Sequence, residues 1–278
     1  DITVAYRVEL PELFTLTRAE YESMHSTWAK AVKVLPNYSI VHKQDFFIEE
    51  GYRPDICKED LSFLSRSFER HFNERPYLQH TCYLFLTKTT KEHSRTTSSF
   101  NALTRGFIIP KEMQDKETVT RFMESCGQFE RIVNDSGLIR IIRLTDEEII
   151  GTKNSAGIIE KYFSMSQEDT TCLQDLSLGA GEMKVGDNYL CLHTLSDPDS
   201  RYERLSTDRS DCRLSFAAPI GILLTCNHIV NQYLFIDDSA EILRKFEQTA
   251  RNMHSLSRYS RSNQINREWI EEYLNEAH

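Results

Sequence analysis

The chain has 278 residues, of which 40% are hydrophobic and 27% are charged, and its formal net charge is −9 at pH 7. This composition is typical of a soluble globular protein with one large or two ordinary domains, and the acidic balance disfavours wholesale binding of nucleic acid. The longest apolar run, residues 216–226, is about half of the ~20 residues that a membrane-spanning helix needs.

The chain begins with the pattern of a strand followed by a helix. Apolar and polar residues alternate over residues 2–10, which predicts a strand with one buried face. Thr17 and Glu20 have the spacing of a capping box, which marks the start of a helix. Pro36 and Asn37 end this helix. Its apolar side chains recur at helical spacing: Tyr21, Met24, Trp28, Val32 and Leu35.

The alternation of strand and helix continues over the next 50 or so residues. Residues 38–48 predict a second strand, and Asp60 is the expected cap of a second helix, which ends before Pro76. Residues 81–87 are apolar on both faces, which is typical of a central strand. The second helix is expected to carry one apolar stripe, which consists of Leu61, Leu64, Phe68 and Phe72.

Residues 88–115 are polar and poorly periodic, and we place a domain boundary near this segment. The second half then repeats the mixture of helices and strands, with another capping box at Thr145 and Glu148. Its expected elements are a helix with an apolar stripe over 119–133, a strand over 138–144, a short helix around 158–163, a hairpin turning at 186–188, a strand over 229–236, a long helix capped by Asp238 or Ser239, and a helix over 267–278.

These elements predict an α+β protein built from two layered β/α subdomains with mainly antiparallel sheets, in the style of a ferredoxin-like fold. The first subdomain covers residues 1–112 and the second covers residues 113–278. The last helix stops without Gly or Pro, so we expect the second subdomain to be truncated and completed by further sequence of a longer protein.

The chain carries no recognisable motif of a nucleotide-binding or hydrolytic site. The nearest approach to a phosphate loop, residues 181–186, is followed by Asp187 and Asn188 instead of Lys and Ser or Thr, and an acidic side chain there would repel phosphate. A hairpin turn is the better interpretation of this segment. There is also no G-x-S-x-G sequence. We therefore expect no catalytic site and no cofactor in this chain.

Seven cysteines occur singly, which indicates reduced thiols in a cytosolic protein and not a disulfide framework. Three Cys–His pairs have one intervening residue: His80 with Cys82, Cys191 with His193, and Cys226 with His228. Each pair would offer two ligands on one face of a strand, but structural zinc sites favour a different spacing. Cys191 and Cys226 lie in apolar runs that are typical of buried thiols. We expect no metal site.

Residues 251–267 contain four arginines and no acidic residue, although the protein as a whole is acidic. Three interpretations remain open for this stretch: a solvated helix and connector, a docking surface for an acidic partner, or a set of phosphate contacts with nucleic acid. The candidate partner-docking residues are Arg251, His254, Arg258, Tyr259, Arg261 and Arg267.

Five segments carry a resemblance to a known family: residues 2–17, 28–47, 63–88, 202–221 and 252–278. They resemble the N-terminal region of TraG-type ATPases of Bacteroides-like conjugative transposons, which are relatives of the assembly ATPase of type IV secretion systems. The resemblance covers nearly the whole chain, except that the family tends to have a longer loop near 197–202. The residues that match the family pattern are Leu35, Pro36, Phe68, Arg70, Phe72, Arg75, Tyr83 and Leu84.

In this family the motor, with its phosphate loop, follows the region that the chain resembles, so ATP and Mg²⁺ are expected only in that absent motor. The resemblance implies conjugative DNA transfer, a hexamer-type assembly and a cytoplasmic position at the inner face of the bacterial inner membrane. It also implies two partners, the C-terminal ATPase domain of the same chain and inner-membrane components of the secretion system.

The resulting hypothesis is a non-catalytic domain that docks the motor to the secretion machinery. The exposed sheet faces and residues 251–267 are its candidate contact surfaces. The alternatives are a module that binds single-stranded nucleic acid, although few basic residues support it, a stand-alone interaction protein, and an enzyme with a dispersed site.

Overall fold

The structure is a computed structural model that describes residues 1–12, 15–51, 62–91, 115–165, 175–179, 182–186, 188–191, 224–256, 268 and 270–272. The helices are α1 (Arg18–Val32), α2 (Phe63–Asn73), α4 (Lys116–Asp135), α5 (Asp146–Ile150), α6 (Ile158–Ser164) and α7 (Ser239–Leu256). The strands are β1 (Ile2–Glu9), β2 (Ser39–Glu50), β3 (Tyr77–Lys88), β4 (Arg140–Arg143), β5 (Gly151–Thr152), β6 (Ser155–Ala156), β7 (Leu176–Leu178), β8 (Met183–Val185), β9 (Asn188–Leu190) and β10 (His228–Ile236).

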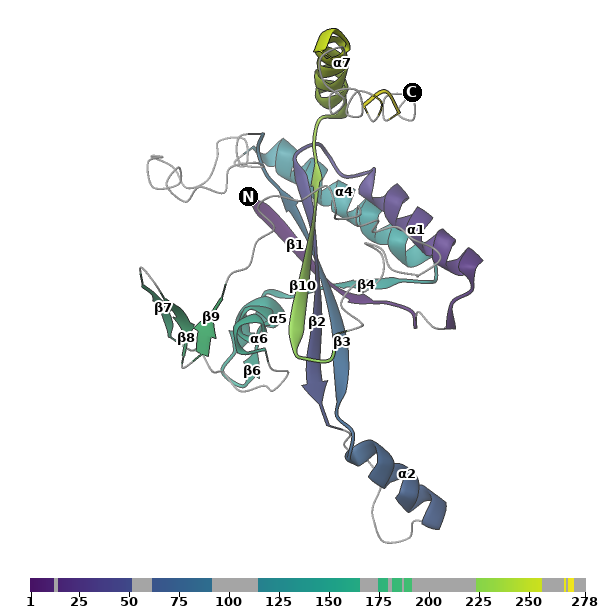
Figure 1. Cartoon of the computed structure of the whole chain (residues 1–278), viewed down its shortest axis with the longest axis vertical. Helices are drawn as coiled ribbons and strands as arrows, with labels where there is room; N and C mark the ends of the chain where they lie inside the picture. Colours follow the sequence, from purple (N-terminus) through teal and green to yellow (C-terminus); the bar gives the residue numbers. More distant parts are fainter. Residues whose placement is uncertain are drawn as a thin grey trace.

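The centre of the fold is a five-stranded antiparallel sheet with the order β10-β2-β3-β1-β4 (Figure 1). β3 lies in the middle, as its apolar residues on both faces predict. It pairs with β2 along its full length, from Ser39 opposite Lys88 to Glu50 opposite Tyr77. Two small antiparallel sheets, β5-β6 and β7-β8-β9, complete the strand content. The α+β fold class is therefore confirmed.

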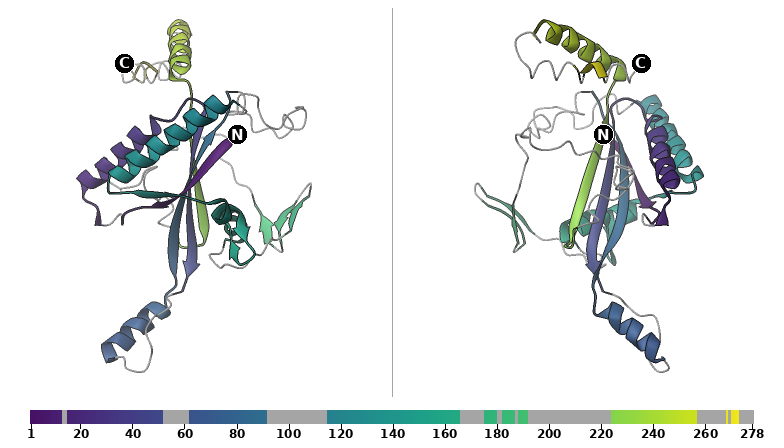
Figure 2. Two further views of the ribbon diagram at one scale, coloured as in Figure 1. Left: turned by 180° about the vertical axis from the view of Figure 1, so that it is seen from behind. Right: turned by 45° about the vertical axis from the view of Figure 1, so that its right-hand side comes forward.

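One face of the sheet is covered by α1 and α4, which lie side by side (Figure 2). The apolar stripes of both helices are buried against the sheet: Met24 and Phe129 have no exposed surface, and the rings of Trp28 and Phe129 meet edge to face at 5.8 Å. The capping box of Thr17 and Glu20 starts α1 as predicted. This layer forms the larger hydrophobic core.

A smaller core lies on the opposite face of the sheet. Here Phe46 and Tyr83 of the sheet pack with Ile158 at the start of α6. The capping box at Thr145 and Glu148 begins α5, and α6 follows closely because the hairpin β5-β6 turns the chain back. Together with the sheet, these two short helices line a cavity.

The sheet does not follow the predicted division of the chain at residue 112. β1, β2 and β3 come from the first predicted subdomain, whereas β4 and β10 come from the second, and all five strands form one sheet. The physical reason is that β1 and β2 each had a free edge, and β4 and β10 supply the missing backbone hydrogen bonds.

The cap of α2 differs from the sequence-based expectation. The N-cap is Ser62, whose hydroxyl accepts a hydrogen bond from the backbone N–H of Ser65 at 3.2 Å, so the expectation of Asp60 as the cap is wrong. Asp60 and Leu61 lie outside the described residues. The described part of the predicted stripe, Leu64, Phe68 and Phe72, is exposed.

Candidate functional site

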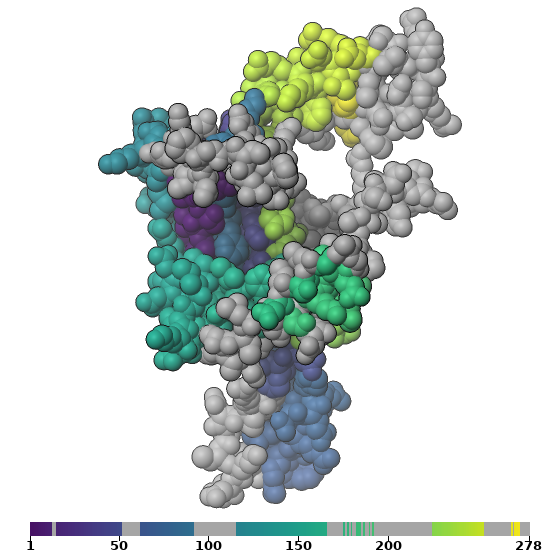
Figure 3. Space-filling view, turned by 90° about the vertical axis from the view of Figure 1, so that its left-hand side faces the viewer, coloured from purple at the N-terminus to yellow at the C-terminus, as the bar shows by residue number. Residues whose placement is uncertain are grey.

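α2 stands away from the rest of the described chain. It follows β2 and precedes β3 where these two strands extend beyond the body of the sheet (Figures 1 and 3). None of its residues is buried. Three of its apolar side chains are spaced four residues apart and form one stripe, which we call the α2 face: Leu64, Phe68 and Phe72, with exposed fractions of 77%, 58% and 41%.

The opposite side of α2 is polar and carries charges of both signs. Arg70 and Glu74 form an ion pair at 2.7 Å along the helix, and Arg66 is exposed on the side away from the α2 face. The rings of Phe68 and Phe72 pack on each other with centroids 4.5 Å apart. α2 is therefore an amphipathic helix with its apolar stripe in solvent. Burial of one such side chain contributes about 1.5–3 kcal/mol, so a complementary protein surface would gain considerably by covering it.

The structure places one of the candidate docking residues predicted from the sequence. Arg251 lies on α7, is exposed, and forms an ion pair with Glu247 at 3.4 Å. Asp238 precedes α7 and caps it, because its carboxylate accepts hydrogen bonds from the backbone N–H groups of Ala240 and Glu241. Of the two predicted caps, Asp238 and Ser239, the first is therefore confirmed. For His254 only the backbone is described. Arg258, Tyr259, Arg261 and Arg267 lie outside the described residues.

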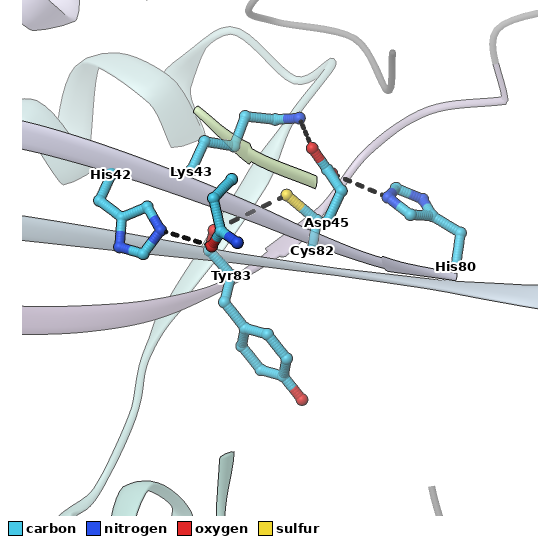
Figure 4. Close-up of polar contacts among 7 residues, drawn as sticks. His42, Lys43, Asp45, His80, Cys82 and Tyr83 are labelled. Carbon is cyan, nitrogen blue, oxygen red and sulfur yellow. Dashed lines mark hydrogen bonds and ion pairs between the residues drawn. The ribbon is translucent and has the colours of Figure 1, made fainter. Parts of the chain in front are cut away.

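A second feature, which the sequence analysis missed, is a buried group of charges on β2 and β3 (Figure 4). The side chains of Lys43 and Asp45 are completely buried and form an ion pair. On its other side, the Asp45 carboxylate lies 2.8 Å from Nε2 of His80, whose side chain is 25% exposed. The sequence already indicated that Lys43 and Asp45 lie close together, because they are two residues apart on a predicted strand and must share a face.

The surroundings of Asp45 determine its charge. Burial alone would raise the pKa of this carboxyl, but the hydrogen bond from His80 and the nearby ammonium of Lys43 together hold the pKa below its usual value. Asp45 therefore remains ionised in the interior. Burial also raises the pKa of the Cys82 thiol well above its usual value, so this thiol is protonated and unreactive at neutral pH. The group is suited to holding β2 and β3 in register, as a network whose members satisfy one another.

The three Cys–His pairs have different surroundings in the structure. The imidazole of His80 is hydrogen-bonded to the carboxylate of Asp45. In the described ranges, no group of three or more His, Cys, Asp or Glu side chains has the geometry to hold a metal ion. Cys191 and Cys226 are exposed, so their interpretation as buried thiols is wrong, because an apolar run in the sequence does not by itself ensure cover in the fold. His193 lies outside the described residues.

Comparison with known proteins adds one match. A family model described as "Domain of unknown function, B. Theta Gene description (DUF3875)" matches residues 1–26, which comprise β1 and the first part of α1. No curated protein matches the chain. In the described part of the chain, no helix combines the length and the apolar character that crossing a membrane requires.

Proposed function

We propose that the chain is a non-catalytic N-terminal domain of a conjugation or type IV secretion ATPase, and that it docks the motor to the secretion machinery for DNA transfer. The family part of this proposal rests on the sequence resemblance. The docking part rests on one structural observation, the exposed α2 face of Leu64, Phe68 and Phe72. Its position beyond the body of the sheet allows a partner to reach it without disturbing the core.

The chemistry of α2 favours a protein partner over a lipid surface. Helices that lie on membranes concentrate Lys and Arg on the polar side, whereas α2 combines Arg66 and Arg70 with Glu69 and Glu74. An amphipathic helix with anchors spaced four residues apart fits an apolar groove of another protein. We assign this groove to an inner-membrane component of the secretion system.

The test uses the complete parent gene in its own host. Reading the gene beyond His278 must reveal a G-x-x-x-x-G-K-[ST] motif, because without a motor the proposal fails. The parent gene is then replaced by a version that carries Phe68→Ser and Phe72→Ser, and by a control with Arg66→Ser on the opposite side of α2.

We expect the double variant to lower conjugative transfer by roughly tenfold to a hundredfold and to abolish co-purification of the parent with the membrane-embedded secretion components. The control should behave like the wild type. ATP hydrolysis by the purified parent should be unchanged in both variants. Normal transfer with the double variant would remove α2 from the docking role. Salt-dependent binding of single-stranded DNA by the chain, lost in the double variant, would favour the nucleic-acid alternative.

A further inference from the structure

A cavity of about 290 Å³ opens between the sheet and the helices α5 and α6, on the face opposite α1 and α4. Its floor is a row of three rings from neighbouring strands: Phe85 of β3, His42 of β2 and Tyr233 of β10. The ring centroids of Phe85 and His42 are 5.2 Å apart, and those of His42 and Tyr233 are 4.2 Å apart. Ile149 of α5 and Ile158 of α6 contribute an apolar wall.

Polar groups gather at one side of this cavity around Asn231 of β10. Its side-chain oxygen accepts hydrogen bonds from Nε2 of Gln44 and from Nε2 of His42, each at 2.8 Å. Its amide nitrogen donates to the hydroxyl oxygen of Tyr162 at 3.4 Å. With these assignments, the Tyr162 hydroxyl hydrogen is left to donate and Nδ1 of His42 is left to accept. The side chains that line the cavity thus include a donor at Tyr162 and an acceptor at His42, beside apolar walls.

The electrostatics of the cavity disfavour a charged occupant. No carboxylate, ammonium or guanidinium is among the described side chains that line the cavity. Burial lowers the pKa of His42, so its imidazole is neutral at pH 7. A charged ligand would give up part of its hydration without gaining a partner of opposite charge, which is unfavourable.

We propose that this cavity binds a small, neutral, planar ring compound that carries both a hydrogen-bond acceptor and a donor, such as an aromatic amide. The volume lies at the lower end of the ~300–1,000 Å³ of small-molecule sites, which limits the ligand to about one ring and a small substituent. The acceptor of the ligand faces Tyr162, and its donor faces His42. This ligand site is independent of the α2 face and goes beyond the proposed docking function.

The test compares three single-ring probes of similar size on the whole chain. Benzamide is neutral, whereas benzoate and benzylammonium carry opposite charges. Saturation-transfer NMR followed by titration of the chemical shifts gives their dissociation constants. We expect benzamide to bind at millimolar concentration or below, and both charged probes to bind at least tenfold more weakly.

Two conservative variants assign the binding to the cavity. Tyr162→Phe removes the donor. It should weaken benzamide binding by about twofold to tenfold, which corresponds to the net contribution of one neutral hydrogen bond. Tyr77→Phe makes the same change on an exposed residue of β3 that does not line the cavity, and it should leave the affinity unchanged.

Three results would overturn the proposal: no benzamide binding at 10 mM, equal affinity for benzamide and a charged probe, or equal effects of the two variants. Tight binding of N-acetylphenylalaninamide without binding of benzamide would also overturn it, because the occupant would then be an aromatic side chain of a peptide.

Discussion

The imidazole of His42 is stacked on the phenol ring of Tyr233, with centroids 4.2 Å apart and planes 13° apart. The pair joins β2 to the edge strand β10, whose outer edge pairs with no other strand in the described chain. Stacked rings contribute about 0.5–1.5 kcal/mol beyond the area that they bury. We predict a coupling free energy of this size in a double-mutant cycle of His42→Gln and Tyr233→Leu, measured by urea unfolding. Additive effects of the two substitutions would show that the rings merely lie next to each other.

His42 also makes the free energy of unfolding depend on pH. Burial lowers its pKa in the folded state below the ordinary value of 6.5, so the unfolded chain binds a proton more readily. The contribution of His42 to the free energy of unfolding should therefore be fully present above about pH 6.5. It should decrease as the pH falls from 6.5 through the lower folded-state pKa. We expect the free energy of unfolding, measured by urea titration, to fall less steeply between pH 7 and pH 5 in His42→Gln than in the wild type. Identical slopes would mean that His42 is not the group responsible.

The buried ion pair predicts a large effect of a small substitution. Asp45→Asn leaves the Lys43 ammonium buried without a counter-charge, which costs about 3–5 kcal/mol. Glu74→Gln is the matched control, because it breaks the exposed pair with Arg70 and should leave the free energy of unfolding nearly unchanged. Urea unfolding measures both variants, and a loss of less than about 1 kcal/mol in Asp45→Asn would contradict the buried position of the pair.

The same carboxylate predicts behaviour in acid. The pKa of Asp45 is lower in the folded chain than its usual value of 3.8, so its contribution is present above that pH and disappears as the pH falls through the folded-state pKa. We expect the chain to lose stability in acid more gradually once Asp45 and Lys43 are both replaced by Leu. Measurement of the unfolding midpoint between pH 5 and pH 2 checks this. An unchanged acid profile would assign the acid sensitivity to other carboxylates.

Two phenylalanines test the contrast between the α2 face and the core. Phe129→Ala removes a completely buried ring and should cost about 3–5 kcal/mol. Phe68→Ala changes a ring that is 58% exposed and should cost less than about 1 kcal/mol. Thermal and urea unfolding of the two variants provide the comparison. Similar losses in both would indicate that α2 packs against the body of the protein in solution.

The local elements of the fold followed directly from the sequence. The caps at Thr17, Thr145 and Asp238 are confirmed, as is the hairpin turn at Gly186, whose φ of 57° suits a residue without a side chain. These features depend on residues that are close in the chain, and spacing alone reveals them. Asp60 failed as a cap because Ser62, only two residues away, has the same chemistry and was equally available.

Features that depend on distant parts of the chain were not predictable in this way. The pairing of β10 with β2 and of β4 with β1 joins two predicted subdomains, and no local periodicity specifies which free edge a strand will choose. In the same way, the stripe of α2 showed which side chains share a face but not whether another element covers them. The burial of Lys43 and Asp45 likewise depends on layers that form elsewhere. The docking function and the family resemblance stay predictions.

The place of β10 in the chain also affects how the protein is made. His42 and its partner Asn231 are 189 residues apart, so the ribosome completes β2 long before β10 emerges. At about 5–20 residues per second, the delay is about 10–40 s. During this interval the chain's own β10 is not yet available to pair with the outer edge of β2, and a β10 from another copy would offer the same hydrogen bonds. We therefore expect slow translation and close spacing of ribosomes on one message to favour exchange of this strand between two nascent chains.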